Sequence, residues 1–275
     1  MRSLEPTLQG KYELLQDLFH NMGSVVVAFS GGVDSTLVLK IGFDVLGPRA
    51  KAVTAISPTF PALEIEEVKR LSAAIGVSLQ MVETDQLQIE AFVQNDASRC
   101  FHCKTDLYRL LSGLRNAEEF HTIVDGTNAD DLGEDRPGIN AARQWGVRSP
   151  LVEADLSKSE IRELAKRLGL ANWNKPAAAC LSSRITRGLP ITKAYLSRVE
   201  RAEAFLVAQG LRQVRVRLHG DLARIEIEPT EMAKLMEESV RCRLVEEFKK
   251  IGFQTITLDL EGYRAGGGNS PSVGS

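Results

Sequence analysis

A glycine pair between an apolar run and a helix constrains the fold of this chain more than any other feature. Residues 24–29, Ser-Val-Val-Val-Ala-Phe, are β-branched and apolar, which is typical of a buried strand. Ser30-Gly31-Gly32 follows at once, and residues 33–46 then show helical spacing up to the terminator Gly47-Pro48. The pattern predicts a strand, a tight turn and a helix.

The same alternation continues through the first two thirds of the chain. Strands are predicted over residues 50–57, 77–84 and 121–125, with an amphipathic helix over residues 64–76. A capping box of Ser157 and Glu160 starts another helix. Strands that alternate with helices predict an α/β fold in which helices on both faces doubly wind a parallel sheet.

The pattern changes past residue 188. A helix over residues 192–209, a hairpin around 219–221, a helix near 232–248 and a strand over 254–260 predict a small α+β unit. We therefore expect three parts: a nucleotide-binding domain over residues 1–187, the α+β unit over 188–264, and a Gly/Ser-rich, disordered tail over 265–275.

Composition narrows the class of protein. The 275 residues include 34 Lys+Arg against 36 Asp+Glu, and this balance argues against a protein that coats nucleic acid. No uncharged apolar run approaches the ~20 residues of a membrane helix, and the first residues are too polar for a signal peptide. We expect a cytoplasmic protein without a membrane partner.

The glycine pair also predicts chemistry. Adjacent glycines let the backbone turn tightly and bring its N–H groups close to an anion. The hydroxyls of Ser30, Ser35 and Thr36 add donors beside the positive end of the helix. The loop lacks the lysine of kinase and GTPase loops and the spacing of dinucleotide loops. A turn that needs glycine for geometry alone is the alternative, which the hydroxyl density disfavours.

A second polar loop follows the strand predicted at residues 121–125. It begins with Asp125-Gly126 and carries four more carboxylates: Asp130, Asp131, Glu134 and Asp135. Ligands of α/β folds bind at the carboxyl ends of parallel strands. Carboxylates there are suited to hold Mg²⁺ against the phosphates of ATP. For each single residue, a solvated acidic loop is the alternative.

Three of the four cysteines suggest a functional site. Cys100 and Cys103 are spaced CxxC, and in a reducing compartment this spacing favours metal, cluster or redox chemistry. Cys180 lies beside small residues and precedes Leu-Ser-Ser-Arg, so Arg184 could lower the pKa of its thiol. A small core residue is the alternative for Cys180. Zinc, with His102 as fourth ligand, and a redox pair are the alternatives for the CxxC.

These motifs resemble a known superfamily. SGGVDS after a strand is similar to the pyrophosphate loop, or PP-loop, of the ATP pyrophosphatases, whose domain is adenine nucleotide alpha hydrolase-like. The resemblance implies that Asp34 sits near Mg²⁺. It also implies ATP contacts from the loop and from the acidic loop: Ser30, Gly31, Gly32, Ser35, Thr36, Gly126 and Asp131.

Within this superfamily the chain resembles the LarE family of ATP-dependent sulfur insertases over residues 10–265. The resemblance rests on SGGVDST, DGTNADDLGEDRPG, RSPLVEADLSKSEIRELAKRLGL, NWNKPAAACLSSR and RVRLHGDLARIE. It implies adenylation of a carboxylate of pyridinium-3,5-biscarboxylic acid mononucleotide and its conversion to a thiocarboxylate, for the nickel-pincer nucleotide cofactor of lactate racemase. It also implies a homo-oligomer, for which a hexamer is plausible.

The resemblance gives the cysteines roles. Cys180 matches the position that carries the sulfur, and in single-cysteine members that thiol is lost and leaves dehydroalanine. Cys100 and Cys103 resemble members whose three cysteines, Cys180 included, hold a [4Fe-4S] cluster. Three thiolates leave one iron open to an extra sulfide. The same pattern resembles cluster-dependent transfer-RNA thiolases, which predict a basic face and salt-dependent RNA binding.

Arginines near the end of the chain suit a phosphate. Arg215 and Arg217 alternate on a predicted strand and therefore share a face, where Arg184 is expected to join them. A guanidinium binds phosphate in bidentate geometry. A salt-bridged strand face is the alternative, and the resemblance favours the substrate's phosphate. Two further functions stay open: a nucleotide-binding module without chemistry, and an ammonia-using ligase, which would not need three cysteines.

Overall fold

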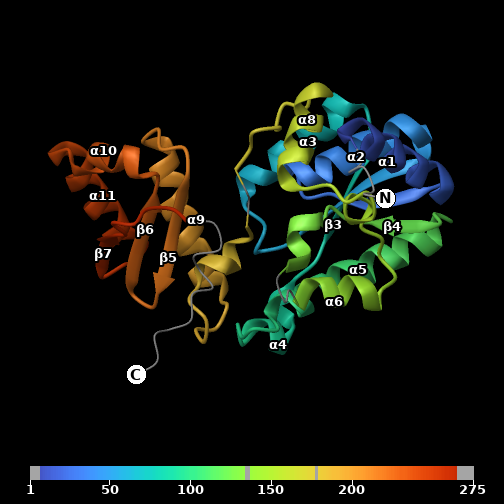
Figure 1. Cartoon of the computed structure of the whole chain (residues 1–275). Helices are drawn as coiled ribbons and strands as arrows, with labels where there is room; N and C mark the ends of the chain where they lie inside the picture. Colours follow the sequence, from blue (N-terminus) through green and yellow to red (C-terminus); the bar gives the residue numbers. More distant parts are fainter. Residues whose placement is uncertain (1–6, 134–136, 177–178, 265–275) are drawn as a thin grey trace. The chain divides into compact units, whose positions relative to one another are not determined.

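The structure, a computed structural model, describes residues 7–133, 137–176 and 179–264. Packing divides the chain into two compact units (Figure 1). Unit 1 holds the chain up to Ser57, Ala62–Gln86 and Ser98–Lys175, and unit 2 holds Pro58–Pro61, Leu87–Ala97 and the chain from Pro176 onward. The domain boundary expected after residue 187 stays a prediction, and the expected tail at 265–275 lies outside the described residues.

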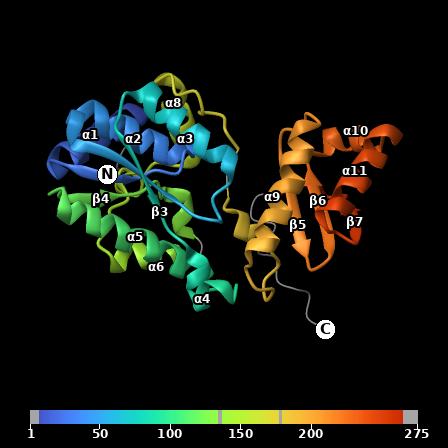
Figure 2. The same cartoon turned by 180° about the vertical axis from the view of Figure 1, so that it is seen from behind.

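Unit 1 has the predicted α/β architecture. Its elements are α1 (Leu8–Met22), β1 (Val25–Ala28), α2 (Val33–Leu46), β2 (Ala50–Ile56), α3 (Ala62–Ile75), β3 (Leu79–Glu83), α5 (Arg99–Ala117), β4 (Thr122–Val124), α6 (Pro137–Gln144), α7 (Pro150–Glu153) and α8 (Lys158–Arg167). The strands are all parallel, in the order β3-β2-β1-β4. Helices α1, α2, α3 and α8 cover one face of the sheet, and α5 and α6 cover the other (Figures 1 and 2). The fold is therefore doubly wound, as the alternating pattern predicts.

The sheet topology places the glycine loop at a crevice. Every residue of β1 is buried, as expected for a strand with neighbours on both sides. The chain moves outward from β1 to β2 and β3, and then returns through α5 on the opposite face to β4 at the other side of β1. Strand order thus reverses between β1 and β4, and ligands of open α/β sheets bind at the carboxyl ends of strands at such a point.

One part of the core lies between the sheet and the α5–α6 face. It is formed by buried sheet and helix side chains: Val26, Ala28, Val53, Ile123, Tyr108, Leu111, Ala141 and Ala142. Helix α5 is not among the predicted elements. Its buried face includes Arg99 and Asp106 beside Tyr108 and Leu111, so polar residues interrupt the apolar spacing that would have revealed it.

Unit 2 contains the smaller α+β fold. Its elements are α4 (Glu90–Val93), α9 (Lys193–Ala208), β5 (Val214–His219), β6 (Leu222–Ile227), α10 (Met232–Met236), α11 (Glu238–Ile251) and β7 (Thr255–Leu258). β5 and β6 form the predicted antiparallel hairpin, and β7 pairs parallel to β6. The helix predicted over residues 232–248 is two helices, because the backbone is extended at Glu237 (φ −57°, ψ 129°).

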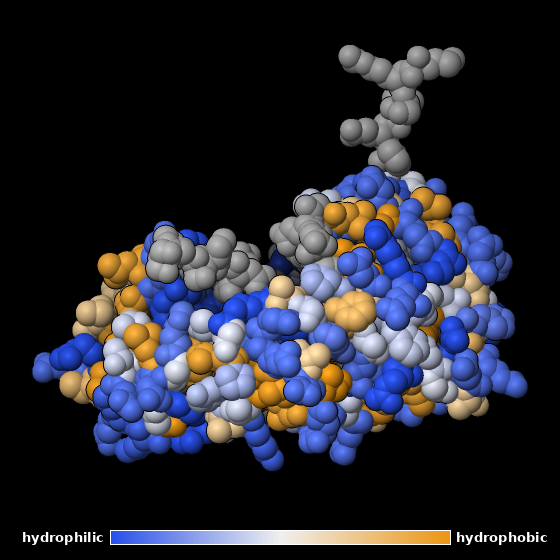
Figure 3. Space-filling view, turned by 90° about the horizontal axis from the view of Figure 1, so that it is seen from below, coloured by the Kyte–Doolittle hydropathy of each residue, from blue (hydrophilic) through white to orange (hydrophobic). Residues whose placement is uncertain are grey.

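No helix within residues 7–133, 137–176 and 179–264 has both the length and the apolar character needed to cross a membrane. Hydrophilic and hydrophobic side chains are intermixed on the face drawn in Figure 3.

Candidate functional site

The glycine loop presents N–H groups and turns its carbonyl oxygens inward. Gly31 has a positive φ of 73°, which favours glycine. The Gly32 carbonyl accepts hydrogen bonds from the Thr36 N–H (3.0 Å), the Thr36 hydroxyl (2.8 Å) and the Ser35 hydroxyl (3.1 Å). Gly32 is the N-cap of α2 and has no capping side chain. The first N–H groups of α2 are therefore suited to bind an anion.

The hydroxyls of the loop stabilise the loop itself. Ser35 Oγ accepts from the Ser30 N–H (3.3 Å) and lies 3.1 Å from Ser30 Oγ. Thr36 is fully buried. Their contact with a ligand stays a prediction, since in this structure the Ser35 and Thr36 hydroxyls fix the turn.

Asp34 carries the features of a cation ligand. Its Oδ2 accepts a hydrogen bond from Lys158 Nζ, at the start of α8, while its Oδ1 is buried without a hydrogen-bond partner among the described residues. The Lys158 N–H also donates to Asp130 Oδ2 (2.7 Å). A lysine ammonium thus neutralises the carboxylate that the resemblance places near Mg²⁺. Neither Lys158 nor its contact with Asp34 follows from the motifs.

The acidic loop after β4 is built around Asp125. This buried carboxylate accepts from Tyr108 Oη (2.7 Å), Ser149 Oγ (2.8 Å) and Thr127 Oγ1 (2.9 Å). Burial would raise the pKa of Asp125, but Lys104 and these hydrogen bonds hold it below its ordinary value. The carboxylate thereby anchors the end of β4 to two helices and fixes the path of the loop.

Gly126 brings this loop against the first turn of α2. An added Cβ at Gly126 would lie 2.8 Å from the backbone nitrogen of Ser35, so only glycine fits. The structure thus brings Gly126 together with the loop residues. Asp131 Oδ2 accepts from the Asn128 N–H (3.1 Å) and shapes the turn, and its contact with ATP stays a prediction. Glu134 and Asp135 lie outside the described residues.

Cys180 lies in unit 2, at the start of a short 3₁₀ helix over Leu181–Arg184. Its half-buried Sγ is 2.9 Å from Ser182 Oγ. The Leu181 N–H donates to the Thr59 carbonyl (2.9 Å), which fixes this segment against the loop after β2 in the chain. Arg184 does fold beside Cys180, as expected, and donates to the Cys180 carbonyl (2.9 Å).

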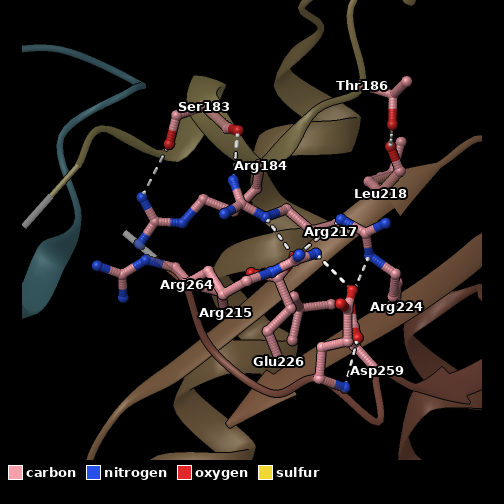
Figure 4. Close-up of polar contacts among 12 residues, drawn as sticks. Ser183, Arg184, Thr186, Arg215, Arg217, Leu218, Arg224, Glu226, Asp259 and Arg264 are labelled. Atoms are coloured by element: carbon pink, nitrogen blue, oxygen red, sulfur yellow. Dashed lines mark hydrogen bonds and ion pairs between the residues drawn. The ribbon is translucent and has the colours of Figure 1, made fainter. Parts of the chain in front are cut away.

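The predicted arginines gather on the polar face of the unit 2 sheet (Figure 4). Arg184 forms a bidentate pair with Glu203 (3.0 and 3.1 Å), and Arg217 pairs with the buried Glu226 (3.0 Å). Ser183 links the two, because its hydroxyl accepts from Arg184 (3.2 Å) and its carbonyl from Arg217 (3.0 Å). Burial and the nearby Arg184 lower the pKa of Arg215. The face therefore carries concentrated positive charge.

Cys100 and Cys103 lie on the first turn of α5, one turn apart on the same side, and both are half-buried. Cys180 belongs to the other unit. Among the described residues, no three His, Cys, Asp or Glu side chains form a group that could hold a metal ion. The predicted cluster ligation by these three cysteines stays a prediction.

Comparison with known proteins gives relatives of nearly full length. The chain is 42% identical over 259 residues to an uncharacterized protein of Synechocystis, covering 94% of this chain and 97% of that protein. It is 36% identical over 261 residues to the pyridinium-3,5-bisthiocarboxylic acid mononucleotide synthase of Lactiplantibacillus plantarum, covering 94% of each. The chain belongs to this LarE family.

A more distant relative matches only part of the chain. One of the component chains of the glutamine-hydrolyzing GMP synthase of Saccharolobus islandicus is 29% identical over 161 residues, covering 53% of this chain and 44% of that protein. This similarity agrees with a PP-loop fold. No family model matches the chain. The full-length relatives therefore give the family its support.

Sequence reasoning missed three polar residues of this LarE-family site. They are Lys158 on Asp34, and Asn172 and Lys175 on the carbonyl of Gly31. All three lie within the sequences SKSE and NWNKP, which indicate a capping box and a family motif but no contact with the loop. Only the fold shows which side chains reach the loop.

Proposed function

We propose that the chain is an ATP-dependent sulfur transferase of nickel-pincer nucleotide cofactor biosynthesis. Its substrate would be pyridinium-3,5-biscarboxylic acid mononucleotide, and its product a thiocarboxylate. The observation that carries the proposal is the inward-facing carbonyl pattern of the SGG loop at the β1–β4 crevice, in a chain similar over its length to a synthase of the bisthiocarboxylic acid mononucleotide.

The first step is adenylation of a substrate carboxylate. A carboxylate oxygen attacks the α-phosphorus of ATP, the bond from that phosphorus to the bridging oxygen breaks, and pyrophosphate leaves. The first N–H groups of α2 would stabilise the departing charge, because they are fixed donors at the positive end of a helix. Asp34 would hold Mg²⁺, since its buried Oδ1 has no hydrogen-bond partner among the described residues.

The second step is transfer of sulfur to the acyl-adenylate. The thiolate of Cys180 would attack the activated carbonyl carbon, and AMP would leave with its electron pair. Loss of the Cα proton with cleavage of the Cβ–S bond would then leave the sulfur on the substrate and dehydroalanine at position 180. Arg184 supports this role by holding the carbonyl groups of Ala179 and Cys180.

A [4Fe-4S] cluster on Cys100, Cys103 and Cys180 is the finer proposal. Thiolates are the donors that such clusters prefer, and a cluster with one open iron would supply sulfide for repeated turnover. The described residues do not show the three thiols as one group, so we derive no step through it. Iron and acid-labile sulfide contents of protein purified without oxygen test the cluster.

About four irons per chain that are lost in Cys100→Ala would support this cluster. Protein that stays free of iron after anaerobic reconstitution would leave Cys180 as a sacrificial donor.

Unit 2 offers a site for the phosphate of the mononucleotide. Arg215 and Arg217 lie on one face of β5, and Arg184 lies beside them. The lowered pKa of Arg215 shows that positive charge is crowded there, and an anion would relieve that repulsion. Because Arg184 and Arg217 are held by carboxylates, Arg215 is the residue that we propose contacts the phosphate first.

Pyrophosphate release tests the adenylation step. With ATP and magnesium, release that depends on the added mononucleotide is expected for the wild type and for Cys180→Ala, because the thiol acts only afterwards. Release that does not respond to the mononucleotide would contradict the proposed acceptor. Arg215→Met should raise the KM for the mononucleotide without changing the KM for ATP.

A further inference from the structure

The back of the SGG loop is held by a segment that follows α8. Asn172 is 3% exposed, and its Nδ2 donates to the Gly31 carbonyl (3.1 Å) and to Thr36 Oγ1 (2.9 Å). These contacts link residues that are 141 and 136 positions apart in the chain. A single buried amide thus joins the glycine turn to the first turn of α2.

The orientation of the Asn172 amide is determined by its surroundings. The Gly31 carbonyl only accepts, and the Thr36 hydroxyl already donates to the Gly32 carbonyl (2.8 Å). A reversed amide would place its oxygen against two acceptors. In the observed orientation Asn172 Oδ1 is buried without a hydrogen-bond partner within the described residues. The amide therefore gives both donors to the loop at the cost of an unsatisfied oxygen.

Lys175 makes a second contact with the same carbonyl. Its Nζ lies 3.3 Å from the Gly31 oxygen and 2.5 Å from Glu64 Oε2 on α3. Helix α3 also confines the loop from the side, because a Cβ at Gly31 would lie 2.9 Å from Val68 Cγ1. Two donors and one helix therefore converge on a single peptide unit.

The geometry of that peptide explains why its carbonyl matters. A peptide bond is planar and trans, so the Gly31 C=O and the Gly32 N–H point in opposite directions. With glycine on both sides, this peptide can rotate into other conformations at little steric cost. Holding the carbonyl inward therefore holds the Gly32 N–H outward, toward the side where an anion would bind.

We propose that Asn172 and Lys175 are positioning residues, which fix the Gly31–Gly32 peptide with its N–H toward the pyrophosphate portion of ATP. The inference rests on the proposed function, because that function places ATP at this loop. Neither residue needs to touch the nucleotide. Their effect is to keep the loop in its anion-binding conformation before ATP arrives, which lowers the free-energy cost of ordering it on binding.

The test compares Asn172→Asp with Asn174→Asp. Asn172→Asp keeps the size of the side chain but replaces two donors by a charge that repels the Gly31 carbonyl. Asn174 is exposed and provides the matched control. We expect the Kd of inorganic pyrophosphate, measured by calorimetry, and the KM for ATP to rise about tenfold or more in Asn172→Asp only, because a buried carbonyl loses its partner. The kcat at saturating ATP should change less than the KM.

Lys175→Met and Lys175→Arg keep the proposal testable if Asn172→Asp does not fold. Lys175→Met should weaken pyrophosphate binding, and Lys175→Arg should restore part of it, since a guanidinium can still donate to the carbonyl. Folded variants whose pyrophosphate Kd and ATP KM stay within twofold of the wild type would overturn the positioning role alone. A wild type that binds neither pyrophosphate nor ATP would overturn the proposed function and, with it, this inference.

Discussion

Replacing Gly126 with alanine is expected to disturb the ATP site, because the turn after β4 packs directly on the first turn of α2. The new Cβ would lie 2.8 Å from the Ser35 nitrogen, 3.1 Å from the Ser35 Cα and 3.2 Å from the Asp34 carbonyl carbon. All three are backbone atoms, so no side-chain rotation relieves the overlap. Either the acidic loop or the start of α2 must move.

The cost follows from this overlap. Forcing one extra carbon into a packed region typically costs about 1–3 kcal/mol. The strain is relieved when the start of α2 shifts, and that shift misplaces the N–H groups proposed to bind pyrophosphate. If about 2 kcal/mol appears in binding, the affinity for ATP falls about thirtyfold. The remainder should appear as a lower free energy of unfolding.

The assay measures the KM for ATP in pyrophosphate release together with urea unfolding. Gly113→Ala is the matched control, because Gly113 lies within α5 and an added Cβ would meet no atom within 4 Å. That variant should gain up to about 1 kcal/mol of stability from helix propensity and keep its KM. A Gly126→Ala protein with the wild-type KM and stability would refute the close approach of the two loops.

Two further substitutions test the polar cores of the two units. Arg184→Met should lower the free energy of unfolding by about 3–5 kcal/mol, because it leaves Glu203, 15% exposed, without its guanidinium. Urea unfolding checks this value, and a loss below about 1 kcal/mol would contradict the pairing. For Asp125, burial alone would raise the pKa, but Lys104 and hydrogen bonds hold it below its ordinary value of 3.8. The stability that wild type has over Asp125→Asn should therefore be complete above that pH and decline as the pH falls below it, and an advantage that grows toward acid would be evidence against this.

The sequence allowed the fold of unit 1 to be predicted because its strands are apolar and its loops carry strong turn signals. Val25–Ala28 and Gly31-Gly32 together left few alternatives to a buried strand before an anion-binding turn. Helix α5 escaped prediction because polar residues such as Arg99 and Asp106 occupy part of its buried face. The break at Glu237 carries no glycine or proline signal in the sequence.

The site was predictable in its loop and not in its supports. Gly31 and Asp34 are recognisable because they lie within one contiguous motif. Asn172 reaches Gly31 from 141 positions away, and a lone asparagine in a polar segment has no local signature. The pairing of Arg217 with Glu226 likewise depends on the register of β5 and β6, where Arg217 lies opposite Arg224 and Arg215 opposite Glu226.

The central claim is that this chain places sulfur on an ATP-activated carboxylate. Mass spectrometry of pyridinium-3,5-biscarboxylic acid mononucleotide, after incubation with ATP, magnesium and protein purified without oxygen, tests it most directly. The account predicts exchange of oxygen for sulfur with the wild type, only when ATP is present, and none with Cys180→Ala. An unchanged mononucleotide with the wild type, or the same product with Cys180→Ala, would contradict it.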